Sequence, residues 1–468
     1  MRLTRRKLLG GAAAAALAGA GVYELVDQLT PAPRRTATTV PPPEQHVLEG
    51  VRVVTDNGVE VVVPPLHHQV VTAKLATGES AKDLAAARAE LADALDRLDE
   101  RFQASPAGLG ITLAWGLPYF RRYVPSAEPR LPVDRRATGT RGRTVRALED
   151  AIRFPSDPDS TVLEDNDVAV LLRSDSLDNI KVGAQALFDD LDGLFTMTSV
   201  RRGFAGGGFA GTTSLPKAMA TAAAINGAEL IPDTAELFLG FTSTSKAALG
   251  PTRIANFETL GYVDLGPDGY FAEGTHMHLS HIFEDLPAWY QLFDFQQRVD
   301  TTFRPGLEVP VGTQTVAQGP QDVQDARGVT RDYDRLRRIG HSGSIQPASR
   351  LERAVTGSDG TLYPRGTAVP QRADFNTLDN PFFWTADPVR DSFQTEPSAG
   401  VHFVVFNPGS DDFRRMRLAM DGILPDGTTL RFDAASPGQG FNQVLTTTHR
   451  QNFIVPPRRH RSFPLSET

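Results

Sequence analysis

Two distant segments of the chain align without a gap at a constant offset of 233 residues, and this repeat restricts the possible folds more than any other feature. The segments are VAVLLRSDSLDNIKVGAQAL, residues 168–187, and VHFVVFNPGSDDFRRMRLAM, residues 401–420. Each begins as an apolar run of strand type, passes through a polar turn, and ends in an amphipathic helical pattern that opens on acidic residues. The repeat indicates an internal duplication of a larger module.

The first copy sits inside a pattern that predicts a complete module. The expected elements are a strand at 69–76, a helix capped by Ser80, strands at 108–115 and 168–172, a helix at 178–191 and a strand at 194–200. This order, βαββαβ, is the ferredoxin-like plan. The second half fits the same plan, with a strand at 270–280, a helix at 284–299, a long insertion, a strand at 401–406 and a helix at 411–421. The fold class predicted is therefore α+β, with two ferredoxin-like modules.

The N-terminal residues resemble a twin-arginine (Tat) export leader. The segment TRRKLLGGAAAAALAGAGVYEL places an arginine pair before a short, weakly apolar, alanine-rich run. We expect a signal peptide at 1–30, a Pro/Thr-rich linker at 31–48, a first module at 49–215 and a second module at 216–468 with an insertion at 300–398. The alternative is a leader that stays uncleaved and associates with the membrane. Export would place the protein in the periplasm, the cell envelope or the extracellular space.

Composition excludes several classes of function. The 468-residue chain has no cysteine, so disulfides, thiolate ligation of haem and cysteine nucleophiles are excluded. Its formal net charge is −8, and residues 1–30 carry four basic and two acidic side chains, so the remainder is more acidic still. An acidic chain of this kind argues against a nucleic-acid partner.

Three segments, one of which includes the first copy of the repeat, resemble the dye-decolorising (DyP-type) peroxidase superfamily, as does the order of elements. They are GLGITLAWGLPYF (108–120), NDVAVLLRSDSLDNIKVGAQALF (166–188) and DGYFAEGTHMHLSHIFEDLPAW (268–289). The resemblance extends over about residues 65–455. It implies a DyP-like dimeric α+β barrel of two ferredoxin-like modules, haem b as cofactor, hydrogen peroxide and a small-molecule reductant as substrates, and a homo-oligomer.

The glycine-rich stretch RRGFAGGGFAGTTSLP, residues 201–216, departs from this superfamily. The superfamily carries a Gly-Phe-x-Asp-Gly loop here, whose Asp handles the protons of peroxide, whereas this chain has Gly211 at that position, or Gly206 in another register. No Asp or Glu occurs between residues 193 and 228. The resemblance places Phe209, Gly211 and Thr212 beside the haem, in a loop that lacks its acid.

His341 is the candidate iron ligand. The superfamily has its ligand in a segment that RRIGHSGSIQPASRL, residues 337–351, resembles, and His341 is the only histidine between 281 and 402. A strict alignment puts Ser344 at the ligand position, three residues later. The other reading of His341 is a hydrogen-bonded loop residue.

An arginine follows the ligand in the superfamily by some twenty residues, where it stabilises charge on the departing oxygen. The segment LYPRGTAVPQRADFN offers Arg372 and Arg365. We prefer Arg372, because QRADFN is closer to the Arg-rich turn of the superfamily.

The pair His276 and His278 leaves a metal site open as an alternative, because a His-x-His pair on a strand can bind copper or zinc. Otherwise we expect a polar strand face.

The leading hypothesis is an exported haem peroxidase or a related haem oxidoreductase. The alternatives are a DyP-like envelope protein that has lost catalysis and keeps a binding or structural role, and a His-ligated metal protein.

Overall fold

The computed structural model describes most of both modules. The described residues are 22–29, 41–56, 59–134, 137, 141–208, 211–241, 269–313, 324–351, 353–356, 362–369, 371–380, 397–431 and 439–467. None of the helices in these ranges is long and apolar enough to cross a membrane.

The first module has the predicted βαββαβ order. Its elements are β3 (His67–Leu75), α3 (Ala81–Arg101), β4 (Gly110–Trp115), β6 (Val168–Ser174), α6 (Leu177–Ala184) and β7 (Phe195–Phe204). Helix α3 begins where expected, because the Ser80 side chain accepts a hydrogen bond from the Asp83 backbone N–H. The strands lie in the order β7-β3-β6-β4.

The second module repeats this arrangement. Its elements are β8 (Thr275–Glu284), α8 (Leu286–Leu292), α9 (Phe295–Thr302), β12 (Phe375–Thr377), β13 (Gly400–Asn407), α13 (Ser410–Met420) and β14 (Leu445–Val455). The strand order β14-β8-β13-β12 corresponds to that of the first module. Helices α6 and α13 begin at Leu177 and Ser410, which are separated by the offset of the sequence repeat. The prediction of two ferredoxin-like modules is confirmed.

The two sheets join at both edges into a closed ring of strands. Strand β12 pairs with β7 through Asn376 and Phe204, and β14 pairs with β4 through Ile454 and Trp115. The interior of the ring is filled by apolar side chains from both modules, among them Val70, Leu171, Met277, Leu279, Val404, Phe406 and Phe453. The two modules therefore share one apolar interior.

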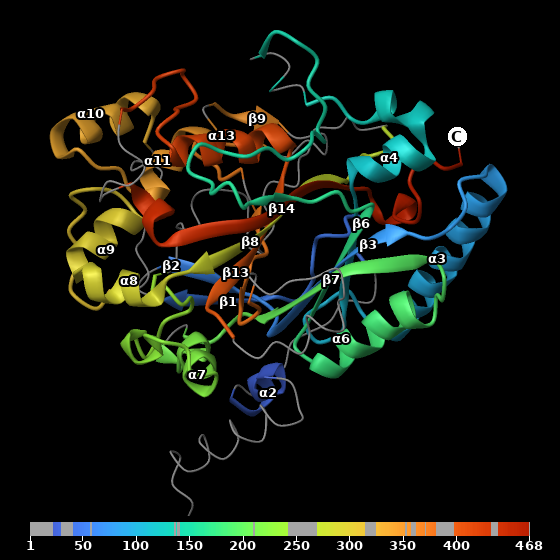
Figure 1. The fold of residues 1–468 in the computed structure, drawn as a ribbon, viewed down its shortest axis with the longest axis horizontal. Coiled ribbons are helices and arrows are strands. Elements are labelled where there is room, and N and C mark those ends of the chain that lie inside the picture. The colour runs from blue at the N-terminus through green and yellow to red at the C-terminus, as the bar shows by residue number, and fades with distance from the viewer. Residues whose placement is uncertain are drawn as a thin grey trace, which may run out of the picture.

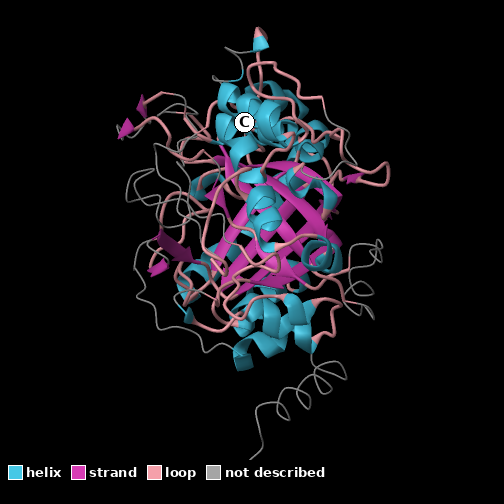
Figure 2. Cartoon of the chain, turned by 90° about the vertical axis from the view of Figure 1, so that its left-hand side faces the viewer, coloured by secondary structure: helices cyan, strands magenta, loops and turns pink. Residues whose placement is uncertain are grey.

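Helices cover the outside of the ring. In Figure 1, α3 and α6 lie on the side of the first module, and α8, α9, α11 and α13 lie on the side of the second. Figure 2 shows the strands in the centre with helices at both ends of the view.

The remaining elements are β1 (Arg52–Asp56), β2 (Val59–Val63), α4 (Leu117–Tyr123), β5 (Val162–Leu163), α7 (Leu215–Ala222), α10 (Ala326–Leu336), α11 (His341–Ser349), β9 (Val355–Thr356), β10 (Leu362–Tyr363) and β11 (Gln371–Arg372).

The end of the expected leader packs into the fold. Helix α2 (Leu25–Leu29) follows Tyr23, whose hydroxyl donates to Asp379 Oδ1 at 2.8 Å and accepts from the Leu378 N–H at 3.0 Å. Asp27 lies 2.7 Å from His67 Nε2. Residues 22–29 therefore form part of the packed structure, although they fall within the range expected for a signal peptide.

Several boundaries differ from the sequence-based expectations. The helix expected at 284–299 is two helices, because Asp294 caps α9 through a reciprocal capping box with Gln297. Strand β7 runs on to Phe204, so the start of the glycine-rich stretch belongs to the sheet. Residues Phe375–Thr377, for which no strand was expected, form β12, the edge strand that joins the two modules.

Candidate functional site

His341 is the first residue of α11, and close backbone packing fixes its position. Gly340 and Gly343 lie against the carbonyl of Phe303, which accepts a hydrogen bond from the Gly343 N–H at 2.7 Å. A Cβ atom at Gly340 would lie 2.5 Å from that oxygen, so a larger residue could not take the same position. The ring of His341 contacts Phe441, with centroids 4.8 Å apart.

The imidazole of His341 is held in its neutral form. Its Nδ1 is buried and has no hydrogen-bond partner among the described residues. Burial, followed by the positive charges of Arg372 and Arg417, lowers the pKa of His341 to about 3. A neutral imidazole with an unused nitrogen has the chemistry of a metal or haem ligand.

Of the two candidate arginines, the structure brings Arg372 towards His341. Arg372 ends β11 and is paired with Val405 of β13. The next residue, Ala373, is part of the ring interior, so Arg372 points to the outer face, where the helices lie. Arg365 lies in an exposed turn before Gly366.

The glycine-rich stretch has a conformational explanation. Gly206, Gly207 and Gly208 have φ angles of +83°, +77° and +79°, a region that residues with a side chain rarely adopt. Gly211, with φ +77°, and Thr212 are both exposed. Phe209 lies outside the described residues. The haem contacts predicted for Phe209, Gly211 and Thr212 therefore stay a prediction.

Two acidic side chains that no sequence motif marks, Asp374 and Glu284, interact electrostatically with each other. Asp374 Oδ1 lies 3.7 Å from Arg372 Nε. Glu284, the last residue of β8, is 7% exposed, and its Oε2 has no hydrogen-bond partner among the described residues. Burial and then the negative charge of Asp374 raise the pKa of Glu284 to about 8. In the sequence, Glu284 resembles an ordinary polar residue at a strand end.

The histidines of β8 lie on a polar strand face, as expected, but this face is buried inside the protein. His276 and His278 are 0% and 1% exposed, because α13 covers this face of the sheet. The His278 ring stacks on the ring of Phe413 of α13, with the ring centroids 3.4 Å apart. The Nδ1 atom of His278 lies 2.7 Å from Asn452 Oδ1. Within the described ranges, no three His, Asp or Glu side chains are arranged so that they could hold a metal ion.

A second group of histidines lies inside the ring. His402 and His449 are the neighbours of His281 on the two adjoining strands. The ring centroids of His281 and His402 are 4.2 Å apart. His402 Nε2 lies 3.0 Å from Asp379 Oδ2. Burial, reinforced by nearby positive charges that include Arg201, holds the pKa of His281 and of His402 well below the usual value.

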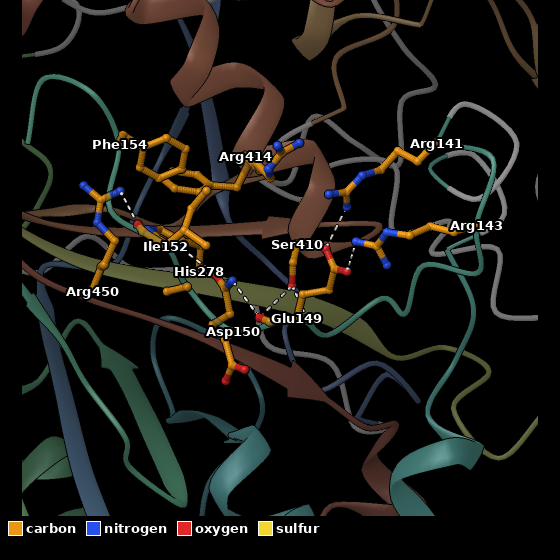
Figure 3. A pocket seen from close by; sticks show the side chains of 13 residues that line it. Arg141, Arg143, Glu149, Asp150, Ile152, Phe154, His278, Ser410, Arg414 and Arg450 are labelled. Carbon is orange, nitrogen blue, oxygen red and sulfur yellow. Dashed lines mark hydrogen bonds and ion pairs between the residues drawn. The ribbon is translucent and has the colours of Figure 1, made fainter.

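A separate cavity of about 290 Å³ lies where the segment 141–157 meets α13 and β14. Figure 3 shows Arg141 and Arg143 reaching Glu149 on one side, with Arg450 on the other. Phe154, Phe413 and His278 also line it. Its arginines are neutralised by Glu149, Asp157 and Asp411, so the cavity has no excess charge that would select an ion.

Comparisons with solved structures give the same fold. Ferric DtpA from Streptomyces lividans matches with a TM-score of 0.50 and 18% identity over 87% of this chain and 94% of its own. A DyP-type peroxidase from Cellulomonas bogoriensis matches with 0.49 and 16% over 89% and 96%. The encapsulated DyP-type peroxidase from Mycobacterium smegmatis matches with 0.48 and 13% over 86% and 95%. The match to DtpA, at 18% identity, concerns the fold alone.

No curated protein matches the chain. The model of a family described as "Family of unknown function (DUF7405)" matches residues 65–457, which include both modules from β3 to the end of β14. The chain therefore belongs to this family of unknown function, and its fold is similar to that of ferric DtpA.

Proposed function

We propose that the protein is an exported, haem-binding peroxidase or related haem oxidoreductase that uses hydrogen peroxide and a small-molecule reductant, and that it acts as a homo-oligomer. The observation that carries the proposal is the state of His341. Its imidazole is neutral, its Nδ1 is buried without a partner, and Arg372 is close enough to affect its charge. These residues fit a haem group, whose iron takes a neutral imidazole.

His341 and Arg372 would have separate roles at this site. His341 would hold the iron of haem b, which, when bound, supplies the redox chemistry. Arg372 would stabilise negative charge on the departing oxygen of peroxide through its guanidinium group. Arg365 is exposed and is the weaker candidate for this role.

Haem uptake tests the proposal directly. We expect the protein expressed with a haem supply to purify with a Soret band, and His341→Ala to lose that band, because the iron loses its ligand. His460→Ala, at a partly exposed histidine, is the matched control and should keep it. In the loaded protein, Arg372→Ala should lower peroxide turnover and Arg365→Ala should not.

Two results would contradict this assignment. A folded wild-type protein that stays colourless with added haemin would favour a DyP-like protein with a binding or structural role, as the acid-free glycine loop suggests. An unchanged haem spectrum in His341→Ala would move the ligand to another residue.

Export is proposed from the arginine pair Arg5 and Arg6. Changing both to Lys should keep the chain in the cytoplasm, as measured by fractionation. We also expect the N-terminus of the exported protein to precede Val22, because Tyr23 hydrogen-bonds to residues 377–379 and Asp27 to His67. Normal export of the double variant would contradict the first expectation, and a mature N-terminus after residue 29 would contradict the second.

A further inference from the structure

Glu284 is a buried carboxyl group for which the fold gives no structural use. Its backbone N–H donates to the Ala399 carbonyl at 3.0 Å, so the end of β8 is tied to the start of β13. Met277 and Leu279 of the same strand point into the ring, so Glu284 lies on the outer face by alternation. Its Oε2 is buried without a hydrogen bond among the described residues. A buried, unsatisfied carboxyl is costly, and its presence therefore needs a reason.

Electrostatic interactions relate Glu284 to the residues of the proposed haem site. Asp374, in the turn between β11 and β12, is the acid that acts on it, and Asp374 in turn lies 3.7 Å from Arg372. From α8, Tyr290 interacts with Glu284, and Arg298 of α9 lies by the same tyrosine, with its guanidinium 5.2 Å from the ring. Arg372 acts on His341. Glu284 and His341 are thus each acted on by one member of the Asp374–Arg372 ion pair.

We propose that Glu284, supported by Asp374, is the proton donor and acceptor of the site and replaces the acid that is absent from the glycine-rich loop. This role rests on the proposed function. The carboxylate of Glu284 takes the proton from one oxygen of hydrogen peroxide and returns it to the other. With this proton delivered, the O–O bond would break and the departing oxygen would leave as water, and a bound haem would supply the two electrons for its reduction.

The environment of Glu284 suits this role. A group that exchanges protons works best when its pKa lies near the working pH, and burial beside Asp374 raises the pKa of Glu284 to about 8. Both protonation states are therefore populated near neutral pH. Two neighbouring carboxyl groups of which one is held protonated are a common acid–base arrangement in enzymes. The second carboxyl group here is that of Asp374, whose Oδ1 lies 3.7 Å from Arg372 Nε.

The test compares Glu284→Gln with Glu308→Gln, a matched change at an exposed position of the same module. In infrared difference spectra, the wild-type protein and Glu308→Gln should both show a carboxyl band that titrates near pH 8. The Glu284→Gln variant should lack this band. This readout needs no haem. In the loaded protein, Glu284→Gln should lower kcat/KM for peroxide by about 10²–10⁴-fold. It should leave the Soret band in place, and Glu284→Asp should restore part of the activity.

The outcomes separate this role from the proposed function. A Soret band in both variants with equal peroxide turnover overturns the role of Glu284 and leaves the haem site intact. A band near pH 8 that persists in Glu284→Gln also overturns it, because the titrating carboxyl is then another residue. A colourless wild-type protein overturns the proposed function and this role with it, whatever the infrared titration shows.

Discussion

Lowering the pH from 7 to 5 should remove several kcal/mol from the free energy of unfolding. Burial is the largest cause that lowers the pKa of four histidines, to about 3 for His68, His276 and His341 and to about 4 for His449. An unfolded histidine takes up a proton below about pH 6.5. The folded state binds fewer protons than the unfolded state over this range, so stability falls as the pH falls.

The magnitude follows from this difference in proton binding. At pH 5, each histidine that stays neutral in the fold costs about 2 kcal/mol relative to neutral pH. Glu284 acts in the opposite direction, because its pKa is raised and its proton is bound in the fold but not in the unfolded chain. It offsets roughly one histidine. The remaining loss is comparable to the roughly 5–15 kcal/mol that stabilises a typical domain.

Urea denaturation at pH 7, 6 and 5 measures the effect. His276→Asn should shift the acid transition to lower pH, since it removes a buried titrating ring. The partly exposed His460 provides the control, and His460→Asn should shift the transition much less. A free energy of unfolding that stays constant between pH 7 and pH 5 would show that these rings are not held neutral.

The fold was predictable where long, periodic elements repeat. The unit at 168–187 and 401–420 became β6–α6 and β13–α13 at equivalent places in the two modules. Strand β12 was not predictable, because it has three residues and its role in the sheet depends on β7 and β13, far away in the sequence. Tertiary pairing decided its structure rather than local pattern.

The burial of polar groups could not be predicted from the sequence either. The His-x-His pair of β8 alternates as a polar strand face would, and only the packing of α13 through Phe413 places it inside. Residues 22–29 show the same ambiguity, because an apolar run such as Leu25 and Val26 suits a leader and a core equally well. The electrostatic effect of Arg372 on His341 depends on the pairing of β11 with β13, which no local motif predicts.

Asp157→Asn should destabilise the protein by about 3–5 kcal/mol, since it removes one partner of a buried ion pair. Asp157 Oδ1 accepts hydrogen bonds from Arg450 at 2.7 Å and from Arg417 at 3.3 Å, and the side chains of Asp157 and Arg450 are each 1% exposed. Arg417 keeps a second carboxylate in Asp421, but Arg450 has no other acid within ion-pair distance among the described residues. Without Asp157, the guanidinium of Arg450 is left beside the ring of Phe154, 4.7 Å away, which cannot replace a full negative charge.

Urea unfolding of three variants separates the loss of the pair from a general loss of packing. Asp159→Asn, two residues away and exposed, should change the free energy of unfolding by less than about 0.5 kcal/mol. The double variant Asp157→Asn with Arg450→Met should be more stable than Asp157→Asn alone, because methionine removes the uncompensated charge and fills much of the same volume. If the double variant is less stable than the single one, the cost comes from lost packing between segment 141–157 and β14, and the ion pair contributes little to holding the two modules together.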